Sequence, residues 1–140
     1  MSTTITIVDE HLGQPGGSAR EVVRALRLAA SEASAAEIIA ARVHAEHADR
    51  MEAGREAAHE PSPAPRTRTE LLAGLRVDSP RAHLAARDAE SAVAEALEAF
   101  RRQRFFFLWD GVQVTDPDRM LPLADGAEAV FVRLFPMQAG

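Results

Sequence analysis

The feature that most constrains this chain is an aromatic β-hairpin signal near the end of the sequence. The run Phe105–Trp109 is followed by Asp110-Gly111 and then by residues 112–114, which read Val-Gln-Val. An Asp-Gly pair between two β-prone runs favours a type I′ turn, because both central residues of that turn need a positive φ angle. A third β-prone run follows at 128–135. The sequence therefore predicts a hairpin, an irregular loop and a final strand.

The N-terminal part predicts a strand at residues 4–8, where Ile5 and Ile7 share one face. Because residues 3–8 and 128–135 are both apolar and β-branched, we expect these two runs to pair in parallel at the centre of a mixed sheet. Residues 9–18 are rich in glycine and predict a turn-rich connection. The next segment, 20–28, has two interpretations. Its start resembles the capping box of a helix, whereas the alternation at its end favours a strand. We choose the strand.

Two helices are predicted. The first begins at Ser34, where Glu37 completes a capping box, and runs to about residue 58. Its apolar stripe recurs every fourth residue and consists of Ile39, Val43, His47 and Met51. The second is predicted from Ser79 to about Arg102, because Ser-Pro is a favourable helix start.

This order of elements resembles that of ubiquitin and other β-grasp proteins, in which a hairpin leads through an irregular loop to a last, central strand. The resemblance covers residues 3–50 and 104–140, and it rests on element order and hydrophobic spacing. It implies an α+β fold in which a ubiquitin-like β-grasp mixed sheet packs on one main helix. Residues 1–140 would form a single domain. Residues 51–103 would be an inserted helical arm with a proline-rich linker at 60–68.

The composition of the chain argues against several classes of function. The net charge of −5 argues against a nucleic-acid partner, which would need a clustered positive field. The chain has no cysteine, and all 16 of its basic residues are arginine, so thiolate and lysine chemistry are excluded. No apolar run approaches the roughly 18 residues of a membrane span. We therefore expect a cytoplasmic protein without a membrane partner.

The histidines and acidic residues that could bind a metal or act as catalytic acids have simpler structural explanations. His44 and His47 lie three residues apart on the first helix, but a third ligand could come from His59 or His83 only through the fold. The acidic residues near the hairpin occur in the Asp-Gly and Asp-Pro pairs that turns require, and they are Asp110, Asp116, Asp118 and Asp125. No nucleophile motif or phosphate loop is recognisable. We expect no metal, no cofactor and no enzymatic activity.

One face of the predicted sheet is a candidate partner surface. If alternate residues of 105–114 face the helix, Phe106 and Leu108 must point away from it. On the last strand, we expect Phe131 and Arg133 on this same outer face, and Val130, Val132 and Leu134 on the helix side. An exposed aromatic patch of this kind is typical of a binding surface. In ubiquitin the open sheet face also carries the apolar patch that partners recognise, and Leu108 would lie near its centre. Alternatively, the second helix covers the patch.

The tail is the last candidate. The sequence ends in Ala139-Gly140 after Pro136, whereas family members that are activated end in a thin tail with a terminal glycine. The resemblance implies a bacterial-type ubiquitin-like protein that acts as a modifier or carrier through Gly140. Its partners would be an ATP-dependent adenylating enzyme and a target protein. The alternative is a non-covalent interaction module that docks onto a larger protein.

Overall fold

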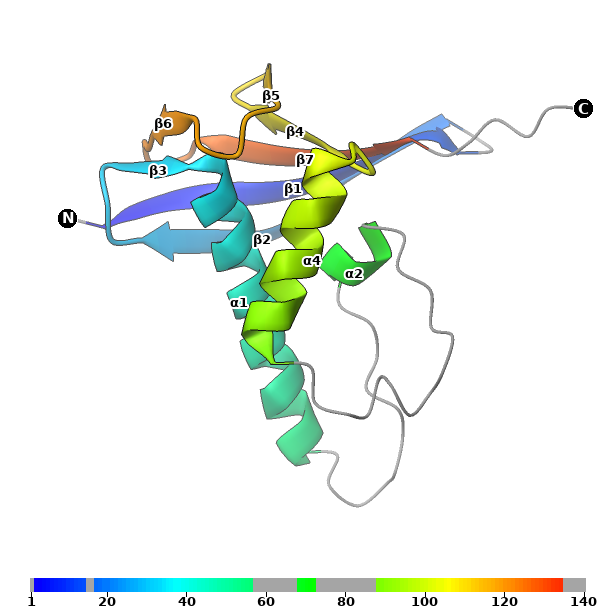
Figure 1. Cartoon of the computed structure of the whole chain (residues 1–140), viewed down its shortest axis with the longest axis vertical. Coiled ribbons are helices and arrows are strands. Elements are labelled where there is room, and N and C mark those ends of the chain that lie inside the picture. The colour runs from blue at the N-terminus through cyan, green and yellow to red at the C-terminus, as the bar shows by residue number, and fades with distance from the viewer. Residues whose placement is uncertain (1, 15–16, 57–67, 73–87, 135–140) are drawn as a thin grey trace, which may run out of the picture.

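The computed structural model describes residues 2–14, 17–56, 68–72 and 88–134. Five strands form a mixed sheet in the order β2-β1-β7-β4-β5 (Figure 1). Their bounds are β1 Thr3–Gln14, β2 Gly17–Leu28, β4 Phe106–Trp109, β5 Val112–Val114 and β7 Glu128–Leu134. A separate two-stranded sheet pairs β3 with β6, and the helices are α1, α2 and α4. Their bounds are β3 Glu32–Ser34, β6 Met120–Pro122, α1 Ala35–Glu56, α2 Arg68–Leu72 and α4 Ala89–Arg101.

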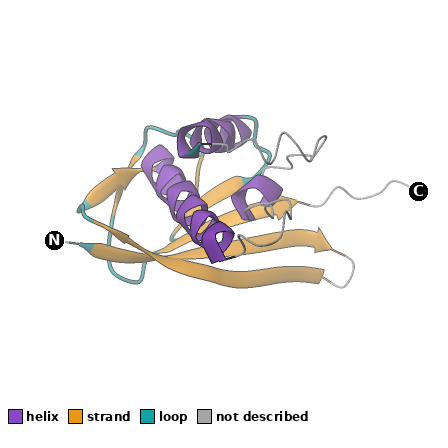
Figure 2. Ribbon diagram, turned by 90° about the horizontal axis from the view of Figure 1, so that it is seen from below, coloured by secondary structure: helices purple, strands orange, loops and turns teal. Residues whose placement is uncertain are grey.

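The α+β class predicted from the sequence is confirmed. Strand β1 runs parallel to β7, with Thr6 opposite Glu128 and Leu12 opposite Leu134, so the two form the centre of the sheet as expected. Both neighbours of this pair, β2 and β4, are antiparallel to it. The three described helices lie on one side of the sheet (Figures 1 and 2). This arrangement is consistent with a β-grasp-like sheet that packs on a main helix.

The segment with two interpretations is a strand, as we chose. The turn-rich connection predicted for residues 9–18 is wrong, because pairing between β1 and β2 continues from Asp9 opposite Glu21 to Gln14 opposite Gly17. The register shifts twice along this pair, once at Ile7/Val8 and once between His11 and Gln14. These irregularities absorb extra residues, which lets two long strands stay paired where the sequence had indicated a loop.

Helix α1 begins with the predicted capping box. The Ser34 hydroxyl accepts a hydrogen bond from the Glu37 amide at 3.1 Å, and the Glu37 carboxylate accepts one from the Ser34 amide at 3.5 Å. The amides of Ala35 and Ala36 donate to carbonyls of the loop before β6. These contacts fix the start of α1 against the two-stranded sheet. At its other end α1 runs past the five-stranded sheet (Figure 1), which explains why Met51 is half exposed.

Helix α4 starts later than predicted. Asp88 has an extended backbone, and its carboxylate accepts a hydrogen bond from the Ser91 amide at 2.7 Å, so the helix does not continue through Asp88 from Ser79. Residues 79–87 lie outside the described residues. Of the linker predicted at 60–68, residues 60–67 also lie outside them, whereas Arg68 is the first residue of helix α2, so the linker prediction is wrong at that position. The last turn of α4 places Phe100 in the core, and its ring contacts Phe105 and Phe107.

The β4–β5 hairpin has the predicted turn. Asp110 and Gly111 have φ angles of 46° and 84°, as a type I′ turn requires, and Trp109 pairs with Val112 across the turn. Below it, Phe107 and Phe131 meet edge to face with ring centres 5.2 Å apart. Such pairs add roughly 0.5–1.5 kcal/mol beyond their buried area. Aromatic contacts therefore join α4, β4 and β7 in one core.

We predict that Val43→Asp unfolds the protein, because Val43 is only 4% exposed in the core and an unpaired buried carboxylate costs several kcal/mol. Thermal unfolding followed by circular dichroism provides the measurement. Met51→Asp on the same helix is the matched control, since Met51 is 50% exposed, and this variant should stay folded. A Val43→Asp variant that melts like the control would contradict this packing.

Candidate interaction surface

The sheet face turned away from the helices carries an apolar row that crosses four strands. Val8 lies opposite Val22 of β2 and opposite Val130 of β7. Val130 in turn lies opposite Leu108 of β4. Residues opposite one another in neighbouring strands share a face of the sheet. The row Val22–Val8–Val130–Leu108 therefore spans the open face from its β2 edge to β4.

The members of this surface differ in how accessible they are. Val8, Val130 and Val132 form a small cluster with exposed fractions of at most 6%. Three larger side chains pack against this cluster and remain partly accessible, namely those of Leu12, Phe106 and Leu108. Val22 is 65% exposed. We define the open-face patch by its accessible members, Leu12, Val22, Phe106 and Leu108. The buried valines form the floor of the patch.

Charged residues lie on the open face without giving it a net sign, and one ion pair crosses the apolar row. Arg20 on β2 lies opposite Glu10, and Glu128 on β7 lies opposite Thr6. The guanidinium of Arg20 contacts the Glu128 carboxylate at 2.6 Å, so this ion pair crosses the strand between them, β1. The fully buried Val8 lies midway between the two positions. Because the pair is half exposed, it contributes at most about 1 kcal/mol to stability.

Two residues predicted for this surface lie on the opposite face. Phe131 is 0% exposed and packs with Phe107 in the core on the helix side. Arg133, two residues further along β7, shares that side. The predicted orientation of β7 was therefore wrong, and Val130 and Val132 face outward instead. Apolar residues occupy both faces of a central strand, so alternation could not choose between them.

Phe106 and Leu108, by contrast, lie on the open face as predicted. The alternative that the second helix covers them does not hold for α4, which packs on α1 on the other side of the sheet (Figures 1 and 2). Among the described residues, no helix lies over the open face.

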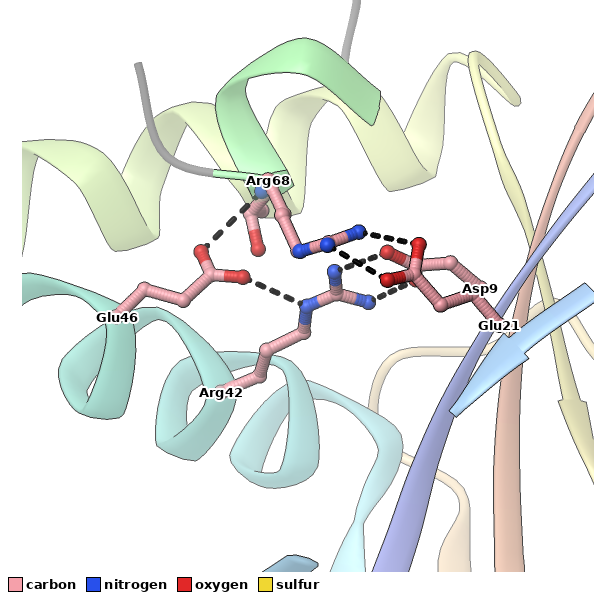
Figure 3. A network of polar contacts seen from close by, with 6 residues as sticks. Asp9, Glu21, Arg42, Glu46 and Arg68 are labelled. Atoms are coloured by element: carbon pink, nitrogen blue, oxygen red, sulfur yellow. Dashed lines mark hydrogen bonds and ion pairs between the residues drawn. The ribbon is translucent and has the colours of Figure 1, made fainter. Parts of the chain in front are cut away.

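On the helix side, a buried ion network joins α1 to the sheet (Figure 3). The two terminal nitrogens of Arg42 donate to the two carboxylate oxygens of Asp9, at 2.6 and 2.7 Å. The Arg42 Nε donates to Glu46 Oε1 at 3.0 Å, and the Glu46 Oε2 accepts from the Thr69 amide at 3.2 Å. The Arg42 guanidinium carbon lies 4.5 Å from the centre of the Phe131 ring, so a cation–π contact adds to the ion pairs.

The network keeps Arg42 charged although its side chain is fully buried. Burial by itself would lower the pKa of Arg42, but the hydrogen bonds and charges of Asp9 and Glu46 outweigh burial and raise that pKa. Our sequence reasoning missed these residues. A signal was present, because Ile38, Arg42 and Glu46 recur every fourth residue, which places two opposite charges on the buried stripe of the helix.

The other candidate residues are the histidines of α1, the aspartates near the hairpin and the two residues at the end of the chain. His44 is exposed and His47 is half-buried, and the described part of the chain contains no group of three or more residues arranged to hold a metal ion. Three of the four turn aspartates accept backbone hydrogen bonds; the bond to Asp116 lies within its own turn, whereas those to Asp110 and Asp125 come from distant parts of the chain. These bonds are Asp110 from the Glu128 amide, Asp116 from the Asp118 amide and Asp125 from the Thr4 amide. Ala139 and Gly140 lie outside the described residues.

Comparison with protein-family models, with curated proteins and with solved structures found no match. Within the described ranges, none of the helices combines the length and the apolar character needed to cross a bilayer.

We predict that Arg42→Met lowers the free energy of unfolding by about 3–5 kcal/mol, because it leaves the buried carboxylates of Asp9 and Glu46 without their cation. Urea unfolding at neutral pH measures the loss. Arg102→Met is the matched control, since Arg102 pairs with Glu98 on the surface and both are more than half exposed. Equal stability of the two variants would show that the network contributes little.

Proposed function

We propose that this chain is a ubiquitin-like interaction protein of the cytoplasm, which binds a partner protein through the open face of its sheet and performs no chemistry itself. The observation that carries this proposal is the open-face patch, an apolar surface on a sheet face that none of the described helices covers. Apolar groups that remain accessible on an ordered surface favour burial against a partner.

The support of the patch favours the same function. Leu12, Phe106 and Leu108 stand on strands that are hydrogen-bonded on both sides, Val22 stands on the edge strand β2, and three buried valines belong to the same face. Binding therefore requires little ordering of the backbone, which is a main cost of association. Leu108 lies on β4 next to the central strand, so a partner centred there can contact Phe106 and Val22 from one footprint.

The charges around the patch indicate what kind of protein fits. Arg20 and Glu128 neutralise each other, and Glu10 and Arg27 add one charge of each sign on the same face. Protein interfaces usually combine apolar contact area with polar groups that are already paired. We infer a partner with an apolar contact surface and little net charge there, such as one face of a helix or a loop on a larger docking protein.

We expect a photo-crosslinking amino acid at Phe106 to capture this partner in cells, because Phe106 borders the patch centre. Val112 provides the control position, since it is 56% exposed but belongs to the opposite face of the sheet. Adding Leu108→Arg should abolish the Phe106 adduct while the melting temperature changes by only a few degrees. Mass spectrometry of the adduct names the partner.

Two outcomes would contradict the proposal. The same adducts at Phe106 and at Val112 would mean non-specific capture. If Leu108→Arg costs several kcal/mol of stability, Leu108 belongs to the core, and the open face is a structural surface.

A second candidate function is that of a modifier or carrier that is activated at Gly140. The observation in its favour is that β7, the described strand that comes before residues 135–140 in the sequence, is held between β1 and β4. In this proposal a separate adenylating enzyme uses ATP to activate the Gly140 carboxylate for transfer to a target protein. A terminal glycine would leave the carbonyl open to attack, because it has no side chain.

The modifier proposal has its own test. Intact mass spectrometry of the natural protein asks first whether it ends at Gly140. Incubation with ATP and a co-encoded adenylating enzyme should then give an adduct at Gly140, and deletion of Gly140 should remove the adduct without changing the fold. The absence of lysine predicts single adducts rather than branched chains. A different natural terminus, or no adduct, would rule out this function.

A further inference from the structure

Helix α2 occupies an acceptor site on the helix side of the molecule. It is only 5 residues long, Arg68–Leu72, yet it makes three kinds of contact with the surrounding elements. It pairs with a carboxylate on β2 and bonds to a carboxylate on α1 (Figure 3). It also places an apolar side chain in the core. A helix this short is unstable in isolation, so its conformation depends on the site that holds it.

The first contact is an ion pair made by the side chain of an arginine. Both terminal nitrogens of Arg68 donate to the two carboxylate oxygens of Glu21, each at 2.8 Å, which is the planar fork that only a guanidinium provides. The hydrogen bonds from Arg68 lower the pKa of Glu21. Both side chains are about half exposed, so this pair contributes more to selectivity than to strength.

The second contact is a hydrogen bond from the backbone amide of the next residue. The Thr69 amide donates to Glu46 Oε2, and Thr69 is buried. The other oxygen of Glu46 is fixed by Arg42, which Asp9 holds in turn. The acceptor carboxylate is therefore positioned by residues outside α2.

The third contact is the burial of a leucine side chain. Leu72 is 2% exposed and belongs to the main core cluster, and α2 contacts both α1 and α4. Positions four apart on a helix lie on the same side, so Arg68 and Leu72 contact the site from one face of α2. The site thus selects an arginine and a leucine at this spacing on one helical turn.

We propose that this acceptor site is a peptide-binding site for a helical turn with arginine at its first position and leucine at its fifth. Its own Arg68–Leu72 segment occupies the site as a tethered ligand. A partner protein that presents the same turn competes with this segment. Covalent tethering gives the internal ligand an effective concentration of about millimolar, so a partner gains access when the internal contacts weaken.

The experiment uses the full chain with the double substitution Arg68→Ala and Leu72→Ala, which empties the site of its two selected side chains. A fluorescently labelled peptide that copies residues 66–74 is titrated, and anisotropy reports binding. We expect the double variant to bind this peptide at least about tenfold more tightly than the unsubstituted chain does. A peptide with alanine at the arginine and leucine positions should not bind, and Glu21→Gln in the double variant should weaken binding.

A folded double variant that does not bind the peptide overturns the proposal, and so does binding that ignores the peptide's arginine and leucine. If the double variant does not fold, Arg68→Ala replaces it, because this variant keeps the buried leucine. It should bind the peptide about threefold more tightly than the unsubstituted chain, and equal binding would overturn the proposal. Leu108→Arg on the opposite face should leave peptide binding unchanged, which separates this site from the open-face patch.

Discussion

The buried pairing of Arg42 with Asp9 and Glu46 is the constraint on which the arrangement of this molecule depends. A charge removed from water costs several kcal/mol unless it is paired and hydrogen-bonded. The guanidinium lies on α1, the bidentate carboxylate on β1, and the ring beneath the cation, that of Phe131, on β7. Sliding or rotating α1 by one residue would separate all three groups. The network therefore fixes how the main helix lies on the two central strands.

This constraint also explains how the two faces of the sheet differ. The helix side takes Phe105, Phe107 and Phe131, the buried charges and α2, and it makes the dense contacts that stabilise the fold. The other face carries a smaller apolar cluster of valines, with Phe106 and Leu108 packed against it. Most of the contacts that stabilise the fold therefore lie on one side of the sheet, so a substitution of an accessible residue on the open face can change that surface without disturbing the main core.

Local chemistry in the sequence predicted part of this structure. The Asp110-Gly111 turn, the capping box at Ser34 and the parallel pairing of the first and last long strands follow from turn residues, caps and β-branched runs, and all three are confirmed. The direction of Phe131 depends on pairing with β4, which alternation within an apolar strand cannot encode. Helix α2 is held by residues distant in sequence, so no local pattern indicated it.

The position of β7 has a consequence for how the chain folds. Among the described strands it comes last in the sequence, but it fills the middle of the sheet, where it joins the β1–β2 pair to the β4–β5 pair. Until β7 has been synthesised, these two hairpins have no common neighbour, and their inner edges remain unpaired. A sheet closed by contacts between distant residues forms slowly. The emerging protein therefore depends on its final strand to convert two separate hairpins into one cooperative unit.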